Sequence, residues 1–92
     1  MLIKLNVREQ VYKGIDVFLQ KYTEKFKYCV YEENYIFKLK PTLIYCFLQD
    51  LYSFVNNEDN QIKSNLLFYP IEFVVSFKGL ILHVSLYDTY RE

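Results

Sequence analysis

The 92-residue chain contains no tryptophan and no alanine, and it has only two glycines and two prolines. So little glycine and proline excludes a collagen-like or low-complexity chain. A hydrophobic share of 52% excludes a disordered one. No apolar run approaches the roughly 20 residues that a membrane helix requires. In place of alanine the chain uses Lys, Asn, Ile, Phe and Tyr, which AT-rich codons encode, and this favours a low-GC bacterium or one of its phages and plasmids as the source.

Neither sign of charge predominates, because 11 basic residues balance 11 acidic ones. A neutral chain has no overall attraction for nucleic acid or anionic membranes, so such binding would require a local basic patch. The first residues lack the basic start and long apolar centre of a secretory signal. We therefore expect one compact cytoplasmic domain over residues 1–92, without membrane contact.

Cysteine is scarce as well, with only Cys29 and Cys46 present. In a chain without a secretion signal, we expect both to be free, buried thiols. Two separated cysteines and one distant histidine, His83, do not supply the four close ligands of a zinc site. We expect neither a metal ion nor a cofactor.

Two segments have the apolar spacing of amphipathic helices. In residues 7–26 apolar side chains recur every three or four positions, and Asn6 with Glu9 forms a variant capping box at the start. The second helix covers residues 43–55, with Thr42 as the expected N-cap. Its polar residues form only a narrow stripe, so it should carry apolar surface in excess of what one sheet covers.

Alternating apolar and polar residues predict two β-hairpins and a short first strand at residues 1–5. The first hairpin pairs residues 27–32 with 35–40 about a Glu33-Asn34 turn, and the second lies within residues 66–87 about a Lys78-Gly79 turn. Residues 56–65 form a polar loop. The face of each hairpin that we expect to be buried consists of Tyr28, Val30, Tyr35, Phe37 and Leu39 in the first, and of Ile71, Phe73, Val75, Phe77, Leu80, Leu82, Val84 and Leu86 in the second.

The resulting order, β-α-β-β-α-β-β, predicts an α+β fold. Its first six elements match the split βαβ arrangement of ferredoxin-like folds. In that arrangement both helices pack on one face of an antiparallel sheet and leave the other face open. We expect the strand after the last hairpin turn to extend one edge of the sheet. Such an architecture hosts many unrelated functions, so function must be argued from the surface.

The predicted open face offers two candidate surfaces and little catalytic chemistry. His83 could act as an acid or base, but no nucleophile is arranged beside it, and we interpret it as a surface or interface residue. Large exposed apolar patches commonly mark protein contacts. The candidate protein-binding residues are Tyr31, Ile36, Tyr52, Val74, Ile81, His83 and Tyr87, and the candidate nucleic-acid-binding residues are Lys27, Tyr31, Lys38 and Lys40.

These observations favour a small non-catalytic protein-interaction module. Inhibitors, immunity proteins and counter-defence proteins of phages or mobile elements fit its size and composition. The alternative is a single-stranded nucleic-acid-binding protein that uses a basic and aromatic sheet face. Because the second helix and the open sheet face both carry surplus apolar surface, we also expect a homodimer, with Ile81 or Tyr52 at the contact.

Overall fold

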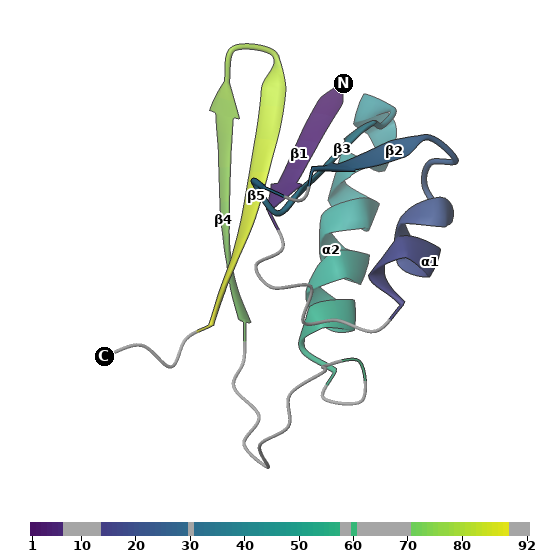
Figure 1. The fold of residues 1–92 in the computed structure, drawn as a ribbon, viewed down its shortest axis with the longest axis vertical. Coiled ribbons are helices and arrows are strands. Elements are labelled where there is room, and N and C mark those ends of the chain that lie inside the picture. Colours follow the sequence, from purple (N-terminus) through teal and green to yellow (C-terminus); the bar gives the residue numbers. More distant parts are fainter. Residues whose placement is uncertain (7–13, 30, 58–59, 61–70, 89–92) are drawn as a thin grey trace.

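The computed structural model describes residues 1–6, 14–29, 31–57, 60 and 71–88, and for residues 71–73, 87 and 88 it describes the backbone only. The predicted α+β class is confirmed, with both helices and five strands in the part described (Figure 1). The elements are β1 (Leu2–Asn6), α1 (Ile15–Gln20), β2 (Phe26–Cys29), β3 (Asn34–Lys38), a 3₁₀ turn η2 (Pro41–Leu43), α2 (Ile44–Val55), β4 (Ile71–Lys78) and β5 (Ile81–Asp88).

The five strands form one mixed sheet in the order β2-β3-β1-β5-β4. β1 pairs antiparallel with β3 and parallel with β5. The expected antiparallel ferredoxin-like sheet is therefore corrected at this point. β5 lies inside the sheet beside β1, and β4 takes the edge that we had assigned to the last strand. Alternation along a hairpin identifies its two faces, but it does not indicate which of the two strands joins the sheet.

The core lies between one face of the sheet and the two helices. β1 contributes Ile3 and Leu5, and β5 contributes Leu82, Val84 and Leu86, all at most 6% exposed. They belong to a single buried cluster that also includes residues of both helices. The helical members are Ile15, Phe18 and Leu19 from α1 and Phe47, Leu51 and Val55 from α2. Both helices thus cover the same face, as predicted.

The β2–β3 hairpin has a longer loop than the predicted two-residue turn. Cys29 pairs with Asn34, so Tyr31, Glu32 and Glu33 lie in the loop between the strands, and Glu33 has a positive φ of 56°. Asn34 belongs to the strand because its buried amide accepts a hydrogen bond from Asn6 and donates one to Glu32. The pairing moves by an even number of residues, so the predicted faces are retained.

The β4–β5 hairpin turns at Gly79-Leu80 instead of Lys78-Gly79, since Lys78 pairs with Ile81. Gly79 has a φ of +65°, a conformation that glycine adopts without steric cost. The faces are again as predicted, but burial of one face over the whole hairpin is wrong. Phe77 is 61% exposed although Leu82 opposite it is buried, because β4 is the edge strand of the sheet and lies farther from the helices than β5 does (Figure 1). Leu80, in the turn itself, is 89% exposed.

The predicted start of the first helix is also corrected. Asn6 ends β1, where its amide donates hydrogen bonds to Glu32 and Asn34 instead of capping a helix. The N-cap of α1 is Gly14, with a φ of 73°. Residues 7–13, which include Glu9 of the expected capping box, lie outside the described residues. Phe26, the expected last member of the helical face, lies in β2.

α2 agrees with the predicted helix except at its start. Thr42 lies within the 3₁₀ turn η2, and Leu43 takes the N-cap position without a side-chain hydrogen bond. Pro41 initiates this turn, and the Leu43 N–H donates to the Lys40 carbonyl at 2.9 Å. On the same helix Cys46 is exposed, contrary to the expectation of a buried thiol. Both Cys46 and the half-buried Cys29 are free, as expected.

Candidate interaction surfaces

The sheet face opposite the helices, here called the open face, is the first candidate surface. Strand alternation and the observed pairings place the same side of every strand on it. Its positions with described side chains are Leu2, Lys4, Asn6, Lys27, Cys29, Asn34, Ile36, Lys38, Val74, Ser76, Lys78, Ile81, His83 and Ser85.

Positive charge gathers on the open face although the whole chain is neutral. Lys4, Lys27, Lys38 and Lys78 come from four different strands, and His83 lies between Lys4 of β1 and Ser76 of β4. None of the open-face positions with described side chains is Asp or Glu. The described side chains of the open face therefore carry a local positive charge, which the net charge of the whole chain does not reveal.

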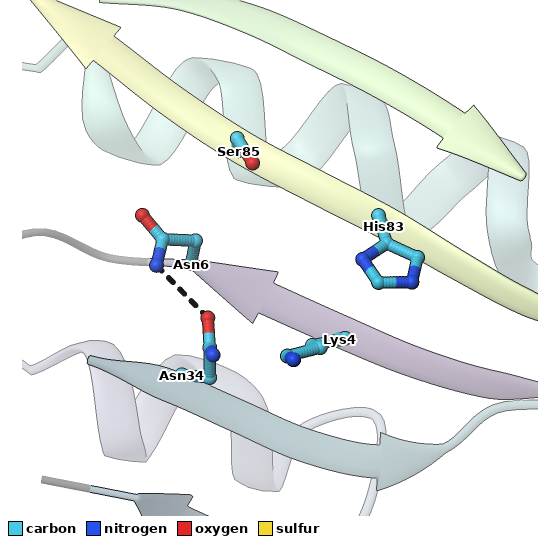
Figure 2. Close-up of a pocket in the computed structure, with 5 residues that line it drawn as sticks. All are labelled: Lys4, Asn6, Asn34, His83 and Ser85. Atoms are coloured by element: carbon cyan, nitrogen blue, oxygen red, sulfur yellow. Dashed lines mark hydrogen bonds between the residues drawn. The ribbon is translucent and has the colours of Figure 1, made fainter. Parts of the chain in front are cut away.

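A shallow hollow of about 320 Å³ lies near the middle of the open face, lined by Lys4, Asn6, Asn34, His83 and Ser85 (Figure 2). Figure 2 shows these side chains on the side of β1, β3 and β5 that is turned away from the helices. They supply a cation, a ring with nitrogen donors, a hydroxyl and two amides.

The loop beside this hollow supplies a competing carboxylate. The Glu32 carboxylate lies 3.6 Å from the Lys4 ammonium and accepts a hydrogen bond of 3.2 Å from the Asn34 amide. An anion that bound Lys4 would have to compete with Glu32. The hollow is therefore a polar part of a larger surface, and its cation is already partly neutralised by Glu32.

The second candidate surface is the hairpin arm, here defined as residues 74–80. Four of its apolar side chains are substantially exposed, namely Val74 at 49%, Val75 at 43%, Phe77 at 61% and Leu80 at 89%. Val75 and Phe77 continue the inner face of the sheet beyond the area that the helices cover. Val74 lies on the opposite, open face. Exposed apolar surface of this kind commonly marks contact sites in soluble proteins.

The exposed side of α2 carries two further aromatic residues. Tyr45 is 72% exposed and accepts a hydrogen bond of 2.8 Å from Gln49, and Tyr52 is 54% exposed. The predicted surplus of apolar surface on this helix is thus present. It lies on the helical layer, so Tyr52 is not brought together with the open-face residues.

Tyr22 and Asp50 form a polar contact between the segment after α1 and α2. The Tyr22 hydroxyl donates a short hydrogen bond to the Asp50 carboxylate. Burial, followed by this hydrogen bond, raises the pKa of Tyr22 to about 12. Burial also raises the pKa of Tyr35 in the core, with a smaller effect from Tyr28. Both effects stabilise the protonated phenols, so these groups hold the fold together and carry no charge at neutral pH.

The predicted protein-binding residues divide among three places. Ile36, Ile81 and His83 are half-buried on the open face, and Val74 lies on it at the arm. Tyr31 is fully exposed in the β2–β3 loop, not on a strand. Tyr87 occupies an open-face register position in β5 opposite Glu72, but its side chain lies outside the described residues.

Of the predicted nucleic-acid-binding residues, Lys27 and Lys38 share the open face. Lys40 is exposed beyond the end of β3, and Tyr31 lies in the loop. Lys4 and Lys78 also lie on the open face, although the sequence did not predict them as nucleic-acid-binding residues. Alternation in β1 already indicates Lys4, whereas Lys78 was assigned to the turn.

The described residues contain no group of His, Cys, Asp and Glu side chains that could hold a metal ion. Among them, no hydrogen bond joins the His83 ring to the Ser85 hydroxyl. No helix in this part of the chain is long and apolar enough to cross a membrane. Comparisons with protein-family models, with curated proteins and with solved structures found no match.

Proposed function

We propose that the chain is a non-catalytic protein-interaction module. The observation that carries this proposal is the uncovered apolar surface of the hairpin arm. Phe77 and Leu80 expose 61% and 89% of their surface, although Leu82, directly opposite Phe77 in the ladder, is buried in the core. Exposed aromatic and aliphatic side chains are favourable when a partner removes them from water.

The biological class that we propose is a small inhibitor, immunity or counter-defence protein that acts by occupying a protein partner. Size and composition support this class, because 92 residues provide a binding surface and little room for a second activity. The open face adjoins the arm through Val74 and Ile81, so a partner seated on the arm would also meet the lysines. We therefore expect a partner with an apolar patch bordered by acidic residues.

A photo-crosslinking amino acid at Leu80 tests this proposal in the cells that make the protein. Val17 on α1 is the matched control, because it is also apolar and 58% exposed but lies on the helical layer. We expect protein adducts at Leu80 in clear excess over Val17, with peptide sequencing to identify them. Equal yields at the two positions would contradict the proposal.

The lysines of the open face favour a second candidate function, single-stranded nucleic-acid binding. Lys4, Lys27, Lys38 and Lys78 could contact phosphates, and the fully exposed Tyr31 could stack on a base. Such binding weakens steeply with salt because neutralised phosphates release counterions.

Fluorescence anisotropy with labelled 20-nucleotide DNA and RNA, at two salt concentrations, measures this binding. Replacing Lys27 and Lys38 by alanine should abolish it if the second function is correct. Replacing Lys21 and Lys25, which lie outside the sheet, is the control with the same change in charge. Salt-sensitive binding that only the first pair abolishes would favour nucleic acid over a protein partner.

A further inference from the structure

The edge strand β4 carries an uncovered backbone as well as uncovered side chains. β5 pairs with one side of β4, and no described strand pairs with the other. An exposed edge presents unpaired N–H and C=O groups that favour pairing with another strand. Natural proteins commonly protect an edge with proline or charged side chains. In β4 the charged positions are 72 and 78, near the two ends of the strand, and the central residues 73–77 (Phe-Val-Val-Ser-Phe) contain neither a charge nor a proline.

We propose that a second copy of this chain pairs with β4, antiparallel and centred on Val75. This inference rests on the proposed function, because it assigns the β4 edge of the hairpin arm to a second copy and leaves Leu80 at its tip for the foreign partner. A two-fold axis perpendicular to the sheet, passing midway between the two Val75 residues, would join the two five-stranded sheets into one sheet of ten strands. Both helical layers would then lie on the same side, and the apolar inner faces would be continuous.

Charge complementarity determines the register. Centring on Val75 puts position 72, a glutamate, opposite Lys78 of the second copy, and symmetry repeats this pair. It also puts Val74 opposite Ser76 and position 73, a phenylalanine, opposite Phe77. Centring one residue earlier would put Glu72 opposite Ser76, and one residue later would put Val74 opposite Lys78. Of these three registers only the one at Val75 pairs opposite charges, which stabilises neighbouring strands.

The same register accounts for the exposed apolar residues of the arm. Val75, now 43% exposed, would meet its own symmetry mate, and Phe77 would take the register position opposite residue 73 of the second copy. Aromatic and β-branched pairs across strands are the stabilising contacts of a sheet. Leu80 lies beyond the paired segment and would stay available to another protein.

Charge exchange tests the register by sedimentation velocity over a concentration series. We expect the wild type to dimerise. Lys78→Glu alone, or Glu72→Lys alone, should weaken the dimer by about tenfold or more, because symmetry creates two like-charge pairs. The double variant Glu72→Lys/Lys78→Glu should restore the wild-type dissociation constant. Circular dichroism verifies that each variant is folded.

Cysteine crosslinking gives an independent measure in a Cys29→Ser/Cys46→Ser background. Val75→Cys should form a disulfide-linked dimer, since directly opposite residues have Cα atoms about 4.5–5.5 Å apart. Val74→Cys and Ser76→Cys are matched controls on the same strand, and neither should crosslink to itself. When these two variants are mixed, the introduced cysteine of one lies opposite the introduced cysteine of the other, and a disulfide-linked heterodimer should form.

A wild type that stays monomeric at 100 µM or more, on the order of a weak dimer's dissociation constant, would overturn the inference. A dimer that the charge exchange leaves unaffected and that Val75→Cys does not crosslink would overturn it too. Foreign-protein adducts at Leu80 with a monomeric wild type would leave the proposed function intact while excluding the second copy.

Discussion

Replacing Leu82 by alanine should destabilise the protein far more than replacing the larger Phe77. The two residues lie directly opposite each other in the β4–β5 ladder and share one face of the sheet. Leu82 is nevertheless 1% exposed and Phe77 is 61% exposed. Burial under the helices, and not residue size, should therefore decide the cost of each substitution.

The expected magnitudes follow from these exposed fractions. A buried Leu→Ala change costs about 2–5 kcal/mol, through lost burial and the cavity left behind. Less than half of the Phe77 surface is buried, and replacing it by alanine leaves no enclosed cavity. The Phe77→Ala substitution should therefore cost about 1 kcal/mol. Against a total stability of about 5–15 kcal/mol, the first change shifts the unfolding midpoint strongly and the second barely.

Urea denaturation, followed by far-UV circular dichroism and tyrosine fluorescence, measures both costs. The samples should be dilute enough for the protein to be monomeric, so that only the chain's own contacts contribute. The slope of stability against urea should be the same in both variants. A loss for Phe77→Ala as large as that for Leu82→Ala would refute this account of the hairpin arm.

Four further substitutions test the rest of the fold. Phe47→Ala should lower the free energy of unfolding by about 3–5 kcal/mol in thermal or urea unfolding, because its buried ring contacts three aromatic residues. Tyr45→Ala on the exposed side of the same helix should cost less than about 1 kcal/mol. Asn34→Ala should cost about 1 kcal/mol in the same assay by removing the hydrogen bonds that its buried amide makes with Asn6 and Glu32, and an unchanged midpoint would contradict these contacts. The raised pKa of Tyr22, about 12, favours the protonated folded state, so its contribution is complete below pH about 10 and is lost as the pH rises towards 12. Stability measured across that range should therefore fall less in Tyr22→Phe than in the wild type.

The sequence by itself determined the element types and the faces of the strands. Side chains alternate with a period of two, and the observed pairing of each hairpin differs from the predicted one by an even number of residues, so Phe37 and Val84 are buried although both predicted turns were wrong. The spacing of apolar residues likewise identified α2, whose buried residues recur every four positions. Local patterns suffice for these features because each depends on residues that are close together in the sequence.

Only the tertiary structure decided which strand of the last hairpin lies inside the sheet and how far the helices cover it. Pairing β5 with β1 buries Leu82 and leaves Phe77 at an uncovered edge, although the two residues have the same place in the alternation. It also brings Lys4 beside His83 from opposite ends of the chain. These outcomes depend on contacts between residues distant in sequence, for which a single sequence carries no local signal.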